Sequence, residues 1–221
     1  MIVIRGLSQA YGGNTVLDHV DLTVAKGEIC ALIGGNGAGK TTLFRSLLGL
    51  MPVRQGTVTL AGIPHRRREW KRHVSFLPEK FQLYPLLTGE ENVRFFASCG
   101  RQTVDFAQIE RVLRQTSLWD DKDKLARDFS KGMLQRLGLA VMLYEQTDIW
   151  ILDEPTSGLD PNGREDILAL IGGLRDKTVL FSTHDVSEVK RVCTHVAVLS
   201  GGKIAKSTAA DFLRQQKGDR G

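Results

Sequence analysis

Apolar residues fall along this chain in short runs that are separated by polar or glycine-containing stretches. Short runs rich in Val, Ile and Leu are typical of β-strands. In one of them, Val20, Leu22 and Val24 occupy every second position, which predicts an antiparallel strand with one exposed face. Helical stretches separate the later runs, and this alternation predicts a mainly parallel sheet. The expected strands are residues 2–5, 16–24, 29–33, 57–60, 74–77, 148–153, 178–183 and 195–200.

A helical spacing of apolar residues follows the strand at 29–33. Leu43, Leu47 and Leu50 fall on one face of residues 41–50, which predicts a helix there.

The middle of the chain predicts helices rather than strands. Thr88 followed by Glu91 matches a capping box, so a helix is expected to begin there. Residues 133–143 are apolar nearly all round, which predicts a buried helix. A further amphipathic helix is marked by Ile109, Val112 and Leu113. We therefore expect a helical subdomain at roughly 85–145, and a last helix at 209–216.

Residues 34–42, GGNGAGKTT, fit the phosphate-binding pattern G-x-x-x-x-G-K-[ST] at every fixed position. Glycines let backbone N–H groups and the positive end of a helix surround phosphate oxygens. Lys40 is then expected to reach the β- and γ-phosphates of a nucleotide, and Thr41 to ligate Mg²⁺. The alternative is a glycine-rich turn before an ordinary helix. The expected nucleotide-binding residues of this loop are Gly34, Asn36, Gly37, Ala38, Gly39, Lys40, Thr41 and Thr42.

Two adjacent acids end a later apolar run, IWILD at 149–153. A buried parallel strand would deliver Asp153 to its carboxyl end, where an aspartate can hold Mg²⁺. Glu154 would then polarise the water that attacks the γ-phosphate. Taken alone, an Asp-Glu pair after a strand also fits a solvated turn.

Three further segments follow the phosphate loop in a fixed order: SKGMLQR at 130–136, DEPTSGLDP at 153–161 and STHD at 182–185. Together with the loop they resemble the ATP-binding subunit of ABC transporters over nearly the whole chain. The separation of Lys40 from Ser130 leaves room for a small helical subdomain, but not for the long coiled coil of chromosome-structure and repair relatives.

This resemblance implies an α/β fold. It would contain a P-loop NTPase core with a mainly parallel sheet, an N-terminal antiparallel β-subdomain and an inserted α-helical subdomain. Residues 1–221 would be a single ABC ATP-binding domain, with 1–84 and 146–221 as the core with its β-subdomain and 85–145 as the helical subdomain.

The resemblance also implies roles for an aromatic residue and a histidine. Tyr11 would stack on the adenine of ATP, although a half-buried strand tyrosine is the alternative interpretation. His184 would contact the γ-phosphate and connect it to Glu154 as a second catalytic residue.

Three more residues would act across a head-to-tail dimer of two such domains. Ser130 would cap a helix whose N-terminus, with Gly132, faces ATP held by the other protomer. Asp160 would lie at the dimer seam. The partners implied are therefore a second copy or a homologous subunit, and an integral membrane permease.

Two motifs depart from the family pattern. Lys131 and Met133 stand where the family's signature has a glycine and a glutamine, and the added charge near phosphate predicts slow turnover. Glu79 stands where the family usually has a glutamine, so it keeps an oxygen ligand for the metal but adds charge. Gln82 is the alternative metal-sensing residue.

Composition agrees with these expectations. With 221 residues, 42% of them apolar, the chain has the size of one α/β domain. No apolar run approaches the roughly 18 residues of a membrane span, and no signal segment opens the sequence, so we expect a cytoplasmic protein on the inner face of the membrane. Cys30, Cys99 and Cys193 are scattered, and we assign them to packing.

The net charge is +5, and its densest part is HRRREWKRH at residues 65–73. Such a segment could touch an anionic bilayer or nucleic acid, or it could be a solvated face beside a membrane complex.

Two functional classes follow. The favoured one is the ATP-hydrolysing subunit of a transporter, with ATP and Mg²⁺ as cofactors; YPLLTGEENV at 84–93 and the segment beginning at Ser130 look most like ABC-2 type exporters. The alternative is a soluble ABC-type ATPase acting on nucleic acid or ribosomes. Members of that class usually carry two ATPase units or a long arm, so the sequence does not favour nucleic acid as a partner.

Overall fold

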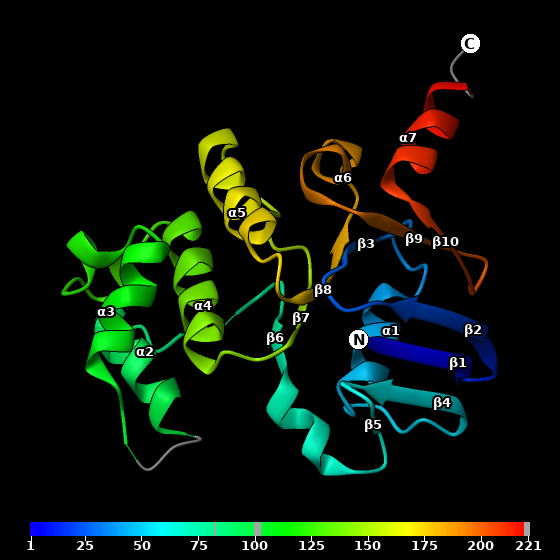
Figure 1. Cartoon of the computed structure of the whole chain (residues 1–221), viewed down its shortest axis with the longest axis horizontal. Coiled ribbons are helices and arrows are strands. Elements are labelled where there is room, and N and C mark those ends of the chain that lie inside the picture. Colours follow the sequence, from blue (N-terminus) through cyan, green and yellow to red (C-terminus); the bar gives the residue numbers. More distant parts are fainter. Residues whose placement is uncertain (82, 100–102, 219–221) are drawn as a thin grey trace.

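The described residues form two β-sheets with helices packed around the larger one and at one end of the molecule (Figure 1). The computed structural model describes residues 1–81, 83–99 and 103–218. Gln82, the alternative metal-sensing residue, lies outside the described residues.

The smaller sheet is antiparallel and has the strand order β2-β1-β4-β5. It consists of β1 (Ile2–Tyr11), β2 (Asn14–Val24), β4 (Gln55–Leu60) and β5 (Ile63–Pro64). The alternation expected in β2 is confirmed, since Val20, Leu22 and Val24 are buried and Asp21 is exposed. β1 runs past the expected residue 5 to Tyr11 because it pairs with β2 along most of its length.

The larger sheet has the order β10-β9-β3-β8-β7-β6. Its parallel strands are β3 (Ile29–Ile33), β6 (Val74–Leu77), β7 (Ile149–Leu152), β8 (Thr178–Thr183) and β9 (His195–Ser200). The expected mainly parallel sheet is confirmed. The additional strand β10 (Lys203–Thr208) is antiparallel to β9 and was not expected, because lysines and small residues occupy it instead of an apolar run.

Apolar side chains cover both faces of the larger sheet. Along β3, Cys30 and Leu32 join a core shared with the smaller sheet and with α1 (Lys40–Leu47). Ile29 and Ala31 join a second core on the opposite face. The helices that contribute to that second core include α5 (Pro161–Gly173), α6 (Val186–Val192) and α7 (Ala209–Gly218).

The expected helix at 41–50 ends three residues early, at Leu47. Leu43 and Leu47 are buried as expected, but Leu50 is 68% exposed. Gly49 adopts a positive φ of 67°, a left-handed backbone conformation that glycine tolerates and that ends the helix. Leu50 therefore leaves the helical face on which its spacing placed it.

A third core joins α2 (Gly89–Ser98), α3 (Phe106–Gln115) and α4 (Lys131–Glu145) at one end of the molecule (Figure 1). The capping box of α2 is confirmed: the Glu91 backbone N–H donates to Thr88 Oγ1 at 3.2 Å, and the Thr88 N–H donates to Glu91 Oε2 at 2.8 Å. Ile109, Val112 and Leu113 are buried, as their spacing in α3 predicted.

A close contact at a glycine connects this helical region to the larger sheet. A Cβ atom at Gly138 in α4 would lie 2.6 Å from Cδ1 of Leu77 at the end of β6. A side chain at position 138 would force the Leu77 side chain to move, so Gly138 lets α4 lie close to the end of β6, shortly before Glu79.

The cysteines differ in exposure. Cys30 is buried and Cys193 is partly buried, as expected of packing residues, but Cys99 is exposed and its assignment to packing is wrong. Cys99 directly follows the last residue of α2.

Among the described residues, no helix is both long and apolar enough to cross a bilayer.

Candidate functional site

The loop between β3 and α1 has a backbone that only glycine accepts at key positions. Gly37 and Gly39 have φ values of 77° and 107°. A Cβ atom at Gly39 would lie 2.9 Å from Cγ1 of Val16, and one at Gly34 would lie 2.7 Å from the Leu199 carbonyl oxygen. The loop is therefore a fixed turn that leads directly into the N-terminus of α1.

Lys40, the first residue of α1, turns its side chain back over this loop. Its ammonium donates to the Gly34 carbonyl oxygen at 2.7 Å and lies 3.9 Å from Oε1 of Glu154. The Lys40 side chain is only 11% exposed. One cation is thus held between the glycine loop and an acid from a distant part of the chain.

A cavity of about 360 Å³ opens beside Lys40. It brings together most of the residues that the sequence assigned to nucleotide and metal. The predicted residues that line it are Asn36, Gly37, Ala38, Gly39, Lys40, Thr41, Thr42, Glu79, Asp153 and Glu154. Val16, on β2, also lines the cavity and was missed, because nothing in the local sequence connects it with the loop.

The lining of this cavity fits Mg²⁺ together with a phosphate group. Thr41, Glu79 and Asp153 contribute hydroxyl and carboxylate oxygens, which are the ligands that Mg²⁺ prefers. Lys40 and the loop amides supply the positive groups that phosphate oxygens require.

Ser182, the fifth residue of β8, connects the two acids. Its hydroxyl donates to Asp153 Oδ1 at 2.7 Å and accepts the Glu154 backbone N–H at 2.8 Å. The Ser182 side chain is fully buried. Sequence analysis gave Ser182 no role, since its contacts depend on β7 and β8 lying side by side in the sheet.

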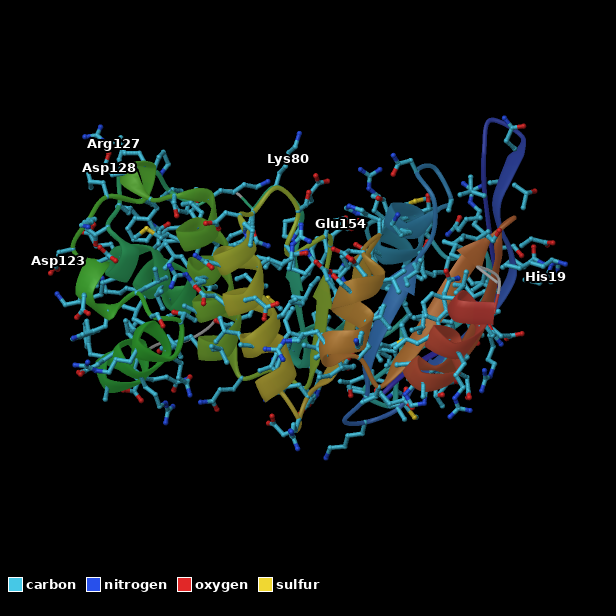
Figure 2. The ribbon with its side chains drawn as sticks, turned by 90° about the horizontal axis from the view of Figure 1, so that it is seen from above. His19, Lys80, Asp123, Arg127, Asp128 and Glu154 are labelled. Carbon is cyan, nitrogen blue, oxygen red and sulfur yellow. The ribbon has the colours of Figure 1, made fainter. Side chains whose placement is uncertain are left out.

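Glu154 and His184 lie together. His184 Nδ1 is 2.9 Å from Glu154 Oε2, and because a carboxylate oxygen only accepts, Nδ1 donates in this contact. The side chain of Glu154 is 17% exposed and that of His184 is 73% exposed. Glu154 has a positive φ of 48°, a strained conformation for a residue with a side chain, and such strain clusters at functional sites. In Figure 2, Glu154 lies near the middle of the molecule.

A buried acid beneath these residues was also missed. Glu188 of α6 is 1% exposed and accepts hydrogen bonds from Thr156 Oγ1 at 2.5 Å and from Thr183 Oγ1 at 2.7 Å. These contacts fasten the loop after Glu154 to the end of β8, directly before His184. Glu188 looks like an ordinary polar residue of a surface helix in the sequence, so no local signal identifies it.

Ser130, Gly132 and Asp160 lie apart from the first cavity. They line a second one, of about 390 Å³. Ser130 caps α4 as expected, since its Oγ accepts the Met133 N–H at 3.2 Å. Asp160 caps α5 by accepting the Gly163 N–H at 2.9 Å. The structure therefore divides the predicted site residues into two separate surfaces of one chain.

Lys131, which replaces a signature glycine, does not disrupt the cap of α4. Its side chain crosses to the loop that follows Glu154, and its ammonium lies directly over Gly158.

Tyr11 ends β1, but its side chain, which carries the adenine-stacking prediction, lies outside what the structure describes.

Known proteins resemble this chain in sequence and in architecture. Residues 17–157 match the protein family described as ABC transporter. The chain is 36% identical over 225 residues to the Nod factor export ATP-binding protein I of Cupriavidus metallidurans, which covers 99% of this chain and 74% of that protein. It is also 35% identical over 221 residues to the bacitracin transport ATP-binding protein BcrA of Bacillus licheniformis. That alignment covers 98% of this chain and 72% of BcrA. A solved structure of an ATP-binding subunit of an ABC transporter matches with a TM-score of 0.85 and 31% identity, covering 98% of this chain and 93% of the other.

Proposed function

The chain belongs to the ABC transporter ATP-binding family, whose shared domain is an ATPase, and we propose that it drives an exporter of the ABC-2 type. The export part of this proposal is supported by relatives named for Nod factor export and bacitracin transport. The observation that carries the ATPase chemistry is the cavity in which Lys40, Asp153 and Glu154 meet beside the glycine loop.

ATP would bind with its β- and γ-phosphates against the loop. Lys40 would exchange its contact with the Gly34 carbonyl for phosphate oxygens, since an ammonium binds an anion more strongly than a neutral acceptor. The N-terminus of α1 adds its partial positive charge at the same place. Tyr11 would stack on the adenine ring.

Mg²⁺ would be held by Thr41 and Asp153, with Glu79 as a further oxygen ligand in the lining of the same cavity. When bound, the metal neutralises the charge that develops on the phosphate oxygens. Ser182 keeps the Asp153 carboxylate in a fixed orientation through its 2.7 Å hydrogen bond.

Hydrolysis would use Glu154 as the general base. A water oxygen attacks the γ-phosphorus in line, its proton passes to the Glu154 carboxylate, and the bond to the bridging oxygen breaks as ADP leaves. His184 donates to Glu154 Oε2, which fixes the direction of the other carboxylate oxygen. The exposed edge of the imidazole is free to meet the γ-phosphate.

The separation of the two cavities supports a site shared between two chains. Ser130, Gly132 and Asp160 line a cavity other than that of Lys40 in their own chain. In a head-to-tail dimer with twofold symmetry, each copy would present these residues to the ATP held by its partner. Closing and opening of this dimer would move an attached membrane permease from the cytoplasmic side. The core at 1–84 and 146–221 would hold the nucleotide, and the helical subdomain at 85–145 would carry the signature.

ATP binding and hydrolysis by two variants test the proposal. Lys40→Ala should lose most ATP affinity in calorimetry, because an uncompensated phosphate charge remains. Glu154→Gln should bind ATP with Mg²⁺ normally but release phosphate at least on the order of a hundredfold more slowly, as expected for loss of a general base. A folded Lys40→Ala protein with unchanged ATP affinity would contradict the phosphate site, and near-normal phosphate release by Glu154→Gln would contradict the assigned base.

A further inference from the structure

A dense group of cations covers the turn between β5 and β6. Arg66, Arg67, Arg68, Lys71 and Arg72 are all exposed, and these five residues are called the basic surface below. Glu69 is the one acid among residues 61–78. Within residues 1–81, 83–99 and 103–218, no carboxylate forms an ion pair with any of the five. Their charges therefore remain available to an external partner.

The basic surface is held rigidly by its own turn. η1 (Arg68–His73) is a 3₁₀ helix at the lower edge of the view in Figure 1. Trp70 is 4% exposed, stacks on His65 with ring centroids 5.1 Å apart, and donates from Nε1 to the His65 carbonyl at 3.1 Å. At the other end, His73 Nδ1 lies 2.7 Å from Asp148 Oδ2. The Trp70 ring is thus buried while the five cations are exposed, and the ammonium of Lys71 also lies 5.8 Å from the centroid of that ring.

An exposed apolar residue follows a glycine that packs against this turn. Gly49 packs against the turn, since a Cβ atom there would lie 3.4 Å from His65 and 3.5 Å from Trp70. Leu50 follows Gly49 and is 68% exposed. An apolar side chain beside a group of Arg and Lys residues is the combination that suits the headgroup region of a membrane.

We propose that the basic surface, together with Leu50, binds the anionic face of a lipid bilayer. Each Lys or Arg near such a surface strengthens binding by about fivefold, so several fixed cations together give a substantial effect. Single-stranded nucleic acid is the less suitable partner, because recognition of unpaired bases uses exposed aromatic rings and Trp70 is buried. The proposal goes beyond ATP hydrolysis: the subunit would touch lipid directly, beside its contact with a permease.

Vesicle flotation with the full chain tests the proposal. Vesicles of phosphatidylcholine alone are compared with vesicles that contain about a third phosphatidylglycerol, and binding is measured at low and high salt. The protein should float only with the anionic vesicles, and salt should release most of it. Equal binding to both kinds of vesicle, or none to either, would overturn the proposal.

A matched pair of triple variants places the effect on the basic surface. The first triple variant combines Arg66→Gln, Arg68→Gln and Lys71→Gln. Its binding to anionic vesicles should be weaker on the order of a hundredfold. The control, Arg111→Gln with Arg127→Gln and Lys190→Gln, removes the same charge from exposed positions elsewhere. Figure 2 shows Arg127 at the far end of the helical region. The control variant should keep most of its binding to anionic vesicles. Equal losses in both variants would overturn the proposal, because binding would then depend on net charge and not on the basic surface.

Two further measurements complete the test. Leu50→Ser should reduce the part of vesicle binding that persists at high salt, because that part comes from apolar insertion. All variants should bind ATP as the unmodified protein does. Loss of vesicle binding with normal ATP binding would therefore concern the lipid proposal alone and leave the ATPase proposal untouched. If the unmodified protein binds a single-stranded oligonucleotide through Arg66, Arg68 and Lys71 but ignores anionic vesicles, the basic surface is a nucleic-acid site and the lipid proposal is wrong.

Discussion

At the scale of single residues, Ser182 connects Asp153, the proposed metal ligand, to Glu154, the proposed general base. Its buried hydroxyl makes hydrogen bonds of 2.7 Å to Asp153 Oδ1 and 2.8 Å to the Glu154 N–H. We expect Ser182→Ala to lower the rate of ATP hydrolysis on the order of ten- to hundredfold, because the partners that orient active groups matter about this much. ATP affinity should change little, since Lys40 and the loop remain in place. Steady-state phosphate release and calorimetry measure the two effects.

The matched control at this scale is Ser75→Ala. Ser75 lies on β6 of the same sheet and accepts a hydrogen bond from Thr147 at 2.7 Å, but it contacts neither acid. Both variants remove one strand serine, so a difference in turnover between them reports on position and not on general loosening of the sheet. Equal turnover in Ser182→Ala and Ser75→Ala would reject the positioning role of Ser182.

At the scale of secondary-structure elements, Asp185 fixes the start of α6, directly after His184. The pKa of its carboxyl is held below the usual value of 3.8, first by the hydrogen bond from Ser187 and further by Arg164. The Asp185 carboxyl therefore binds a proton less readily in the folded chain than in the unfolded chain. Ionised Asp185 stabilises the fold above pH 3.8, and this stabilisation is lost as the pH falls through the lower pKa of the folded chain. Denaturation experiments should therefore show Asp185→Asn less stable than the unmodified protein at neutral pH, with the difference shrinking in acid.

Ser187→Ala separates the contributions to this pH dependence. Removing the serine side chain takes away the largest influence on the Asp185 pKa but leaves the Ser187 backbone N–H, which donates to Asp185 Oδ1 at 2.8 Å. We expect a pH profile between those of the unmodified protein and Asp185→Asn. A difference between Asp185→Asn and the unmodified protein that stays constant down to strongly acid pH would contradict the assignment.

At the scale of the whole molecule, the separation of Ser130 from Lys40 predicts complementation between damaged chains. Lys40→Ala dimers would have two defective loops, and Ser130→Arg dimers two defective signatures, so neither should close on ATP. A mixture forms heterodimers in which one shared site combines both defects and the other combines two intact halves. In a Glu154→Gln background, which slows turnover, sedimentation should show that ATP-dependent dimers return on mixing. Occlusion of ATP by a Ser130→Arg chain without any partner would contradict the shared site.

Elements that depend on local chemistry could be predicted from the sequence. Short β-branched runs became buried strands, Thr88 and Glu91 formed the capping box, and the glycines of residues 34–42 formed the loop that their spacing predicted. In each case the deciding interactions join residues close in sequence: a backbone that only glycine permits, or a side chain that bonds an amide three residues away. The placement of Asp153 and Glu154 at the end of a buried strand followed from the same local pattern.

Features that depend on distant partners could not be predicted from the sequence, because they arise when the chain packs. β10 forms because β9 offers a pairing edge, although its own residues carry no strand signal. Ser182 and Glu188 acquire roles from the strands and loops packed around them, and Leu50 becomes exposed because Gly49 turns the chain away. The resemblance assigned Lys40 and Ser130 to opposite sides of a site shared between two chains, and the folded chain indeed has them in the linings of two different cavities. Such outcomes depend on contacts between residues far apart in the sequence, which no local pattern records.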